Sequence, residues 1–324
     1  MAQAGIIDST KVGGVITAGT ADVGDLFEQI EAASGVLTLG RNIGSMPKGS
    51  MNIPMPLDLI TAQFVNGADG EKPVTDASLK VETLQAGKIA AIAVVPQDVL
   101  DDADIDLWND WLKPQVPSAF GVALDAAALF GVGKPTAWTG FQSGLVPQAV
   151  EAGATVPITA NIYDDIMGED GLIAKVEESG FSVNGFLGKV SMQATLRSAL
   201  DANNRPLYQP FLNPISGRAE KTIDGQPFMA LQNGAWVDTT NKSLMIGGDF
   251  SKLIYSIRKE IEYRISTDAT VKLADGRTVN CFQQNLVAFL MEMRIAAAVI
   301  NPVNRMNQTE NRFPFAVLTE AAGA

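Results

Sequence analysis

Residues 253–266, LIYSIRKEIEYRIS, and residues 287–299, VAFLMEMRIAAAV, decide the fold of this chain. In the first stretch, large apolar residues take every second position except at Lys259, and Ser256 is one of the polar residues between them. The second stretch keeps the same period, with Arg294 at a polar position. Because successive side chains of a strand point to opposite faces, each stretch predicts a long strand with one buried and one solvated face.

A turn-rich connection joins these two stretches. Residues 267–280 contain Asp275-Gly276, a pair that is typical of tight turns. We therefore expect the two strands to run antiparallel as a ladder, which forms the spine of a sheet against which the other segments pack.

Composition sets the scale of the molecule and argues against one function class. The chain has 324 residues, of which 46% are hydrophobic, so it can form one large domain or two or three small ones with a sizeable core. Its formal net charge of −12 argues against an ordinary polyanion-binding protein, because phosphate contacts need Lys and Arg.

Histidine is missing from the sequence, cysteine occurs once, and two kinds of segment are absent. The chain has no histidine, which excludes Ser-His-Asp and Cys-His catalytic sites and histidine metal ligands. Cys281 is the single cysteine, so no disulfide forms within the chain, and we interpret it as a small buried apolar residue. The N-terminus has no basic segment followed by an apolar one, and no apolar run reaches the ~20 residues of a membrane span. We expect synthesis in the cytoplasm and no contact with a membrane.

The first 95 residues predict an arm followed by a hairpin. Residues 1–56 show little core-forming periodicity apart from a short amphipathic helix at 21–33, and such an arm lies on its own subunit or on a neighbour. Residues 57–95 predict a long hairpin with limbs at 57–65 and 79–95. Its polar tip either rests on another subunit or is a plain surface loop.

The next segment predicts a long helix. Residues 104–131 carry apolar residues at helical spacing, with Asp125 on the polar side and Gly131 at the end. Pro114 and Pro117 each remove a backbone hydrogen bond and predict a kink. The acidic residues at its start suit a helix N-terminus; they are Asp101, Asp102 and Asp104.

The middle of the chain predicts a second, mixed α and β domain. Its expected elements are a helix at 161–179, an apolar run at 181–187, a helix near 192–200, a loop at 203–226 and strand-like pieces at 228–244. After the ladder, residues 313–318 predict a short apolar strand.

No motif of enzyme chemistry is complete. Asp102-x-Asp104-x-Asp106 begins like a calcium loop, but Leu107 stands where glycine is required. Gly131-Val-Gly-Lys134-Pro135 lacks the first glycine and the Ser or Thr of a phosphate-binding loop. Asp164-Asp165 and Glu177-Glu178 lie at the two ends of one expected helix, where adjacent residues do not face each other. We predict no catalytic residue, no metal and no cofactor.

Several stretches, in their order along the chain, carry a family resemblance. They are Phe64 to Ser78 followed by Ile89 to Val95, the helix end Leu129-Phe130-Gly131, Gly248-Asp249-Phe250 before the first long strand, and Asn285 through Arg294 to Asn301-Pro302 on the second. Through them the chain from about Asp22 to Leu318 resembles the major capsid proteins of tailed bacteriophages.

The resemblance implies an α+β fold of the Hong Kong 97 type. The implied divisions are an N-terminal arm (1–56), an extended β-hairpin loop (57–95), a peripheral domain with a long spine helix (96–138), an axial α/β domain (139–250), and the long antiparallel peripheral strands with a C-terminal return (251–324).

The resemblance also implies an assembly. Copies of such a chain, made in the host bacterial cytoplasm, form hexamers and pentamers that close into an icosahedral shell, the capsid of the virion. The shell encloses double-stranded DNA without binding it specifically, as suits an acidic subunit. Scaffolding, portal and decoration proteins are the further partners that the resemblance implies. Since the sequence begins directly with the arm, assembly relies on a separate scaffolding protein or on none, or the sequence is a processed form.

One covalent reaction is implied as well. In some family members a lysine of the extended loop is joined to an asparagine of the peripheral domain with help from a glutamate, and Lys72, Asn285 and Glu292 occupy the matching places. The amine would attack the Asn285 carboxamide while Glu292 takes the proton and ammonia leaves. Along a regular strand Asn285 and Glu292 lie on opposite faces, so one site needs either two subunits or a bulge.

A simpler interpretation of the same residues stays open. Asn285 ends a turn, Glu292 pairs with Arg294, and Lys72 makes a surface salt bridge. In either case we expect the ladder face that carries Arg294, and Glu71 beside Lys72 at the tip, to contact neighbouring subunits. Two other functions also stay open, an encapsulin-type compartment shell with the same fold and a cytosolic enzyme, for which the sequence offers no site.

Overall fold

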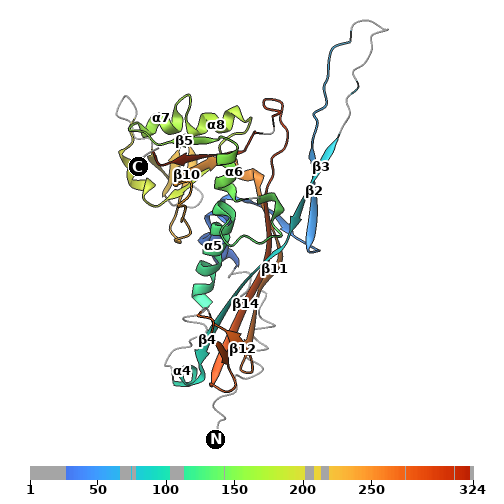
Figure 1. Cartoon of the computed structure of the whole chain (residues 1–324). Coiled ribbons are helices and arrows are strands. Elements are labelled where there is room, and N and C mark those ends of the chain that lie inside the picture. Colours follow the sequence, from blue (N-terminus) through green and yellow to red (C-terminus); the bar gives the residue numbers. More distant parts are fainter. Residues whose placement is uncertain are drawn as a thin grey trace.

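The computed structural model describes residues 27–65, 74, 78–102, 113–141, 143–200, 208–212, 219–273, 275–309 and 311–321. Two sheets make up most of it (Figure 1). A narrow four-stranded sheet runs along the lower part of the view, a seven-stranded sheet with short helices forms the upper body, and the ribbon of β2 and β3 projects away from both.

The predicted ladder is confirmed. β11 (Leu253–Ser266) and β14 (Leu286–Val299) pair antiparallel over their length. β4 (Gly87–Pro96) pairs antiparallel with β14, and β1 (Arg41–Ser45) lies parallel to β11, so the strand order is β1-β11-β14-β4. The connection holds a small hairpin of β12 (Thr270–Lys272) and β13 (Thr278–Asn280), with Asp275-Gly276 at its turn.

The break in the alternation at Lys259 has a structural cause. The pairing of β11 with β14 shifts between Ile257 and Lys259 and again between Lys259 and Glu262. Each shift places an extra residue on β11, as in a β-bulge. Lys259 thereby lies opposite Arg294, while Ile261 returns to the core at 3% exposure.

The ladder is buried on both faces at its upper end, which corrects the prediction of one solvated face. The helix α5 (Lys113–Phe130) packs over one face, where its Phe120 and Leu124 join Tyr255 and Met293 in a common core. The opposite face is covered by the chain before β4 and forms a second cluster of Met46, Met55, Leu84, Ile254, Ala296, Ala298 and Ile300. Ser256, expected in solvent, is fully buried and donates to the carbonyl oxygen of Gly44 at 2.6 Å.

The N-terminal arm lies on its own subunit wherever it is described. Residues 27–33 are helical, as expected for that part of the helix at 21–33, and α3 (Gly35–Leu39) follows. The outgoing limb of the hairpin was placed too late: the strand is β2 (Ser50–Pro56), paired with β3 (Leu79–Gln85), and residues 57–65 form no strand. Pairing ends at Pro56 opposite Leu79, and proline has no N–H group to donate to a neighbouring strand.

The long helix is confirmed where it is described. α5 contains Pro117 inside its first turns and ends at Gly131, whose φ is 70°. The N–H groups of Gly131 and Val132 donate back to Ala127 and Ala126, both at 3.1 Å, which is the pattern of a glycine-capped helix end. Residues 103–112 lie outside the described part of the chain.

The acidic residues before that helix occupy a different place from the predicted one. Asp101 and Asp102 end the short helix α4 (Gln97–Asp102), so they lie at a helix C-terminus instead of an N-terminus. Asp104 lies outside the described residues.

The second sheet has the order β5-β15-β10-β6-β9-β8-β7. Its strands are β5 (Thr155–Pro157), β6 (Gly185–Lys189), β7 (Tyr208–Leu212), β8 (Ala219–Ile223), β9 (Gln226–Leu231), β10 (Ser243–Gly248) and β15 (Phe315–Thr319). The short helices are α6 (Leu145–Glu151), α7 (Ile162–Met167), α8 (Leu172–Glu178) and α9 (Met192–Ser198), with one-turn helices η2 (Thr139–Phe141) and η3 (Phe250–Lys252).

Two expectations for this region are corrected, and a third is confirmed. The helix at 161–179 is two helices, broken where Gly168 and Gly171 separate α7 from α8. The loop at 203–226 contains the paired strands β7 and β8. The C-terminal strand β15 exists as predicted, but it pairs with β10 and β5 in the seven-stranded sheet and not with the long ladder.

Candidate functional site

The structure describes two of the three residues of the predicted cross-link, Asn285 and Glu292. Lys72 and Glu71 lie outside the described residues. Asn285 is the last residue of a turn before β14, with φ at 47°, a left-handed conformation that asparagine tolerates better than most residues. Its carbonyl oxygen accepts from the N–H of Gln97 at 2.8 Å, which ties the turn to α4. The interpretation of Asn285 as a turn end is confirmed.

Glu292 pairs with a residue that the sequence did not suggest. Its Oε1 lies 3.0 Å from Nζ of Lys88 on the neighbouring strand β4, so the expected pair with Arg294 is wrong. The reason is that side chains two residues apart on a strand lie farther apart than cross-strand neighbours. The hydrogen bond from Lys88 lowers the pKa of the Glu292 carboxyl despite some desolvation.

Asn285 and Glu292 of one subunit are too far apart to share a site. β14 pairs with β4 without a register shift from Leu286 to Ile295, so no bulge brings the two residues together. Seven positions along such a strand span about 23 Å. If the two residues act together, they come from different subunits.

The outer face of the ladder carries an ordered pattern of charge. Lys259, Arg294 and Lys88 form one row across β11, β14 and β4, and Glu262 and Glu292 lie opposite each other in the next row. Lys259 pairs with Glu262 at 2.6 Å, as Lys88 does with Glu292. Within the described chain no carboxylate lies within 4.0 Å of Arg294. Arg294 is thus a half-buried cation between two other cations.

A buried polar residue that the sequence did not predict is Asp125. Expected on the polar side of the long helix, it is fully buried. Its carboxylate accepts four hydrogen bonds, from Ser34 Oγ at 2.6 Å, Gly35 N at 3.1 Å, Val36 N at 3.1 Å and Asn233 Nδ2 at 2.6 Å. Asp125 therefore joins α5 to the start of α3 in the arm and to the loop between β9 and β10.

The surroundings of Asp125 oppose its ionisation. Burial raises the pKa of its carboxyl, and the four hydrogen bonds offset only part of that effect. A signal for this site existed in the helical spacing. Asp125 lies four residues after Gly121 and three before Ala128, and both are buried. A Cβ on Gly121 would come within 3.1 Å of the Ala33 backbone, so the glycine admits the arm beside Asp125.

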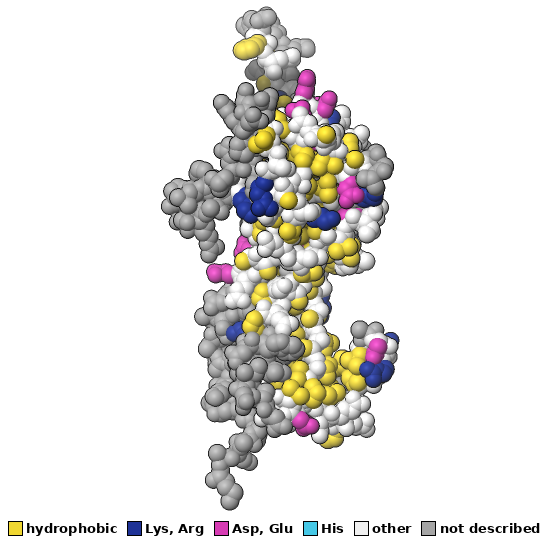
Figure 2. All heavy atoms as spheres, turned by 90° about the vertical axis from the view of Figure 1, so that its left-hand side faces the viewer, with side chains coloured by type: hydrophobic (Ala, Val, Ile, Leu, Met, Phe, Trp, Pro, Cys, Tyr) yellow, Lys and Arg dark blue, Asp and Glu magenta, His cyan; other side chains and the backbone are white. Residues whose placement is uncertain are grey.

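Metal-ligating clusters, membrane-spanning helices and basic stripes were each sought among the described residues. No group of three or more metal-ligating side chains occurs among the described residues. No described helix is long and apolar enough to cross a membrane. On the face shown in Figure 2, basic side chains stand in small separate groups among hydrophobic and uncharged ones and form no continuous stripe.

Large apolar side chains are exposed where the chain leaves the body after β2 and returns into β3. Phe64 is fully exposed and Ile60 is two-thirds exposed. The others that belong to this set, which we call the ribbon extension, are Leu57, Val65, Val74, Leu79 and Val81. Exposed apolar groups gathered on one projecting segment indicate a surface for a protein partner.

Comparison with known proteins gives consistent results. The model of the phage capsid family matches residues 13–304. The major capsid protein of Staphylococcus phage 80alpha is 27% identical over 235 residues, 70% of this chain and 65% of that protein. The probable major capsid protein gp17 of Mycobacterium phage D29 is 26% identical over 279 residues, 84% of this chain and 83% of its own length.

Solved structures agree with the sequence comparisons. A chain from Microbacterium phage Oxtober96 has a TM-score of 0.72 and 28% identity, covering 89% of this chain and 91% of its own. A chain from Mycobacterium phage Adephagia has a TM-score of 0.71 at 23% identity, with 90% and 91% covered, and supports the fold alone.

Proposed function

The chain belongs to the phage capsid family as a major capsid protein of a tailed-phage head, and from this premise we propose that its copies form hexamers and pentamers that close an icosahedral shell. The observation that carries the proposal is the ribbon extension. Its apolar side chains are exposed on a segment that projects from the body (Figure 1), where Arg305 of the same subunit donates to the Ile60 carbonyl oxygen at 2.8 Å. A second copy of the chain would bury them, and burial of apolar surface is the main driving force of association.

The parts of the subunit would then have distinct roles. The long ladder with α5 would form the peripheral domain, and the seven-stranded sheet would form the axial domain at the capsomer centre. The pairing of β15 with β10 supports counting the C-terminal strand with the axial sheet. The ribbon extension and the arm before residue 27 would reach neighbouring subunits.

The net charge of −12 supports a container that does not adsorb its contents. DNA that is packed into the shell must slide along the lining, and an acidic lining with few basic groups offers few phosphate contacts. Scaffolding, portal and decoration proteins would be further partners of the shell.

Negative-stain electron microscopy of the purified protein tests the proposal. We expect hollow closed shells or free capsomers, because the apolar ribbon extension needs a partner of the same kind. Light scattering on the same sample gives the mass. A protein that stays monomeric over a wide concentration and salt range would contradict the proposal.

We also propose a covalent cross-link through Lys72, Asn285 and Glu292, which depends on the formation of shells. A variant of Asn285 tests it. Asn285→Gly removes the carboxamide while glycine keeps the left-handed turn without strain. If the reaction occurs, denaturing gels of wild-type shells show a ladder of linked subunits and Asn285→Gly shells show only monomer. A single monomer band for wild-type shells would end the cross-link proposal.

A further inference from the structure

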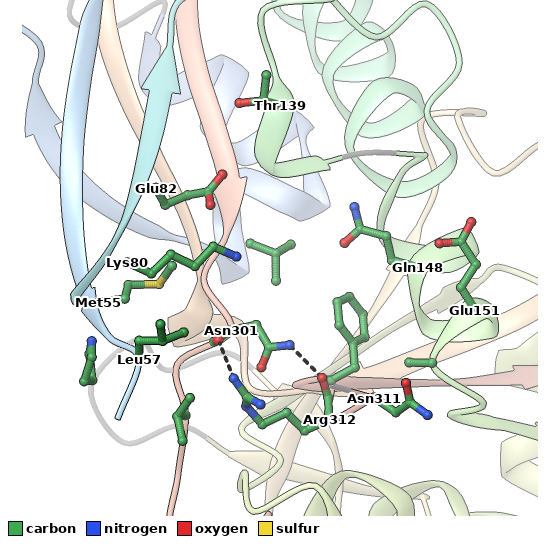
Figure 3. Close-up of a pocket in the computed structure, with 15 residues that line it drawn as sticks. Met55, Leu57, Lys80, Glu82, Thr139, Gln148, Glu151, Asn301, Asn311 and Arg312 are labelled. Atoms are coloured by element: carbon green, nitrogen blue, oxygen red, sulfur yellow. Dashed lines mark hydrogen bonds between the residues drawn. The ribbon is translucent and has the colours of Figure 1, made fainter. Parts of the chain in front are cut away.

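The connection between β14 and β15 is a loop whose two ends are joined by hydrogen bonds. This β14–β15 loop comprises residues 300–314, of which the structure describes all but residue 310. Arg312 donates from Nε to the carbonyl oxygen of Pro302 at 3.1 Å, and its guanidinium also donates to the carbonyl oxygens of Asn301 and Thr309. Asn301 Nδ2 donates in return to the carbonyl oxygen of Arg312 at 2.6 Å (Figure 3). The base of the loop is therefore closed by its own residues.

Asn304 attaches the middle of this loop to the end of α8. Its Nδ2 donates to the carbonyl oxygen of Ser179 at 2.8 Å, and its Oδ1 accepts from the N–H groups of the second and third residues after it, at 3.0 and 2.7 Å. Gly180 leaves room for this amide, because a Cβ at that position would collide with it. The backbone at Arg305, the next residue, is therefore held against the body of the subunit.

Arg305 reaches from the loop to the ribbon extension. Its Nη2 donates to the carbonyl oxygen of Ile60 at 2.8 Å. The pairing of β2 with β3 ends at Pro56, and the two limbs stay joined one step further, where the N–H of Leu57 donates to the carbonyl oxygen of Ser78 at 2.9 Å. Arg305 thus contacts the outgoing limb beyond the part that strand pairing supports.

Nearer the body, a cavity of about 550 Å³ lies between the ribbon and α6 (Figure 3). Leu57 and Lys80 line it on the ribbon side, and Gln148 and Glu151 line it on the α6 side. A segment that passes over an open cavity is held by its base and by contacts beyond the cavity. The hydrogen bond from Arg305 to Ile60 is such a contact, so it restricts the directions that the ribbon extension can take.

We propose that Arg305 is a positioning residue for assembly: it ties the ribbon extension to the β14–β15 loop and so holds the extension in the direction in which a neighbouring copy binds it. This inference rests on the proposed function. A segment that is already ordered loses less conformational entropy on binding, so a preorganised subunit assembles more readily. Arginine suits the role, since its planar group presents several N–H donors at the end of a long side chain.

Pulsed electron resonance on the dissociated subunit tests the contact itself. Spin labels are attached at Phe64→Cys in the ribbon extension and at Val132→Cys after α5, both exposed positions, while Cys281 is buried and stays unlabelled. We expect Arg305→Ala to broaden the distribution of distances between the labels and to shift its mean. A distribution identical to that of the subunit with Arg305 would overturn the proposal.

The assembly of unlabelled subunits tests the consequence. Arg305→Ala should raise several-fold the subunit concentration at which sedimentation detects shells, without a change in melting temperature, because Arg305 is exposed. Arg305→Lys keeps the charge and one donor group and should restore part of the loss. Arg197→Ala is the matched control, since Arg197 is also exposed and donates to a backbone carbonyl, that of Gln193 in its own helix, at 3.1 Å.

Two outcomes separate this proposal from the proposed function. If Arg305→Ala forms shells at the same concentration as wild type, the positioning role is wrong and the proposed function stands. If wild-type subunits form no shells at any concentration, the proposed function fails and the positioning role fails with it.

Asn304→Ala tests whether the loop, and not the arginine alone, sets the direction. This variant removes the hydrogen bonds that hold the loop to α8 but leaves Arg305 in place. We expect it to broaden the distance distribution and to raise the assembly concentration in the same direction as Arg305→Ala, with circular dichroism as the check on folding. A distribution as narrow as that of wild type would contradict the tie through the loop.

Discussion

Replacing Asp125 with alanine is expected to lower the free energy of unfolding by about 3–5 kcal/mol. The change leaves four buried donors without their acceptor, on Ser34, Gly35, Val36 and Asn233. It also loosens three segments together, because α5, the arm and the β9–β10 loop meet at this one carboxylate. Chemical denaturation of the dissociated subunit measures the loss.

Ser118→Ala is the matched control, since Ser118 is exposed on the same helix and its loss should change stability by less than about 0.5 kcal/mol. The loss of stability in Asp125→Asn should lie between the losses in Ser118→Ala and Asp125→Ala. Asparagine keeps one acceptor oxygen but turns an NH₂ group towards backbone donors. An Asp125→Ala subunit as stable as wild type would show that the arm is held by apolar packing alone.

The pH dependence of this difference has a definite sign. Burial raises the pKa of Asp125 above its ordinary value, so the folded subunit binds this proton more tightly than the unfolded chain. The Asp125 carboxyl therefore adds its full stabilisation to the folded subunit below about pH 4. That stabilisation declines as the pH rises through the pKa of Asp125 in the folded state. The stability gap between wild type and Asp125→Ala should therefore narrow from acid towards neutral pH. A gap that widens instead would mean that the hydrogen bonds outweigh burial.

Arg294→Glu is expected to abolish shell formation while leaving the subunit folded. Arg294 lies between Lys259 and Lys88 in one row of cations, and within the described chain no carboxylate compensates it. A glutamate in this place would be attracted to both lysines, so the folded subunit loses nothing. If Arg294 contacts an acidic group of a neighbouring copy in the shell, as we propose, reversal of its charge would turn that attraction into repulsion.

Arg294→Lys keeps the charge and should form shells in reduced yield. The yield of shells from Arg294→Met should lie between those of Arg294→Lys and Arg294→Glu. Sedimentation separates shells from subunits, and thermal unfolding of the dissociated subunits reports on the fold. A lowered melting temperature for Arg294→Glu would place the role of this arginine inside the subunit and contradict an assembly contact.

The ladder could be predicted because its information is local. Alternation over more than a dozen residues predicts a strand, and β11 and β14 are confirmed as strands, although Ile265 on the predicted buried face is 46% exposed and Ala288 on the predicted solvated face is buried. Even the exception at Lys259 was visible, although its meaning, two bulges that turn one lysine outwards, required the partner strand.

The features that escaped prediction depend on residues far apart in the sequence. Asp125 looked like a solvated helix residue because its donors lie on Ser34 and Asn233. The pairing of Glu292 with Lys88 likewise depends on the register of β4 against β14. The segment that contains β7 and β8 is rich in proline, glycine and asparagine. These residues are typical of turns, so the pattern predicted a loop in place of two short strands. Composition alone cannot show such pairings.

The place of β15 has a consequence for the synthesis of the subunit. β15 pairs on one side with β10 and on the other with β5. Because Thr155 of β5 lies opposite Val317 of β15, β5 cannot pair with β15 until Val317 has been synthesised. Until residues 315–319 leave the ribosome, β10 has an open edge and the sheet is unfinished. A chain that is cut short by a nonsense mutation or a stalled ribosome therefore never completes its sheet. We therefore expect copies truncated before β15 to be left out of assembly, because β10 and β5 lack the strand that joins them.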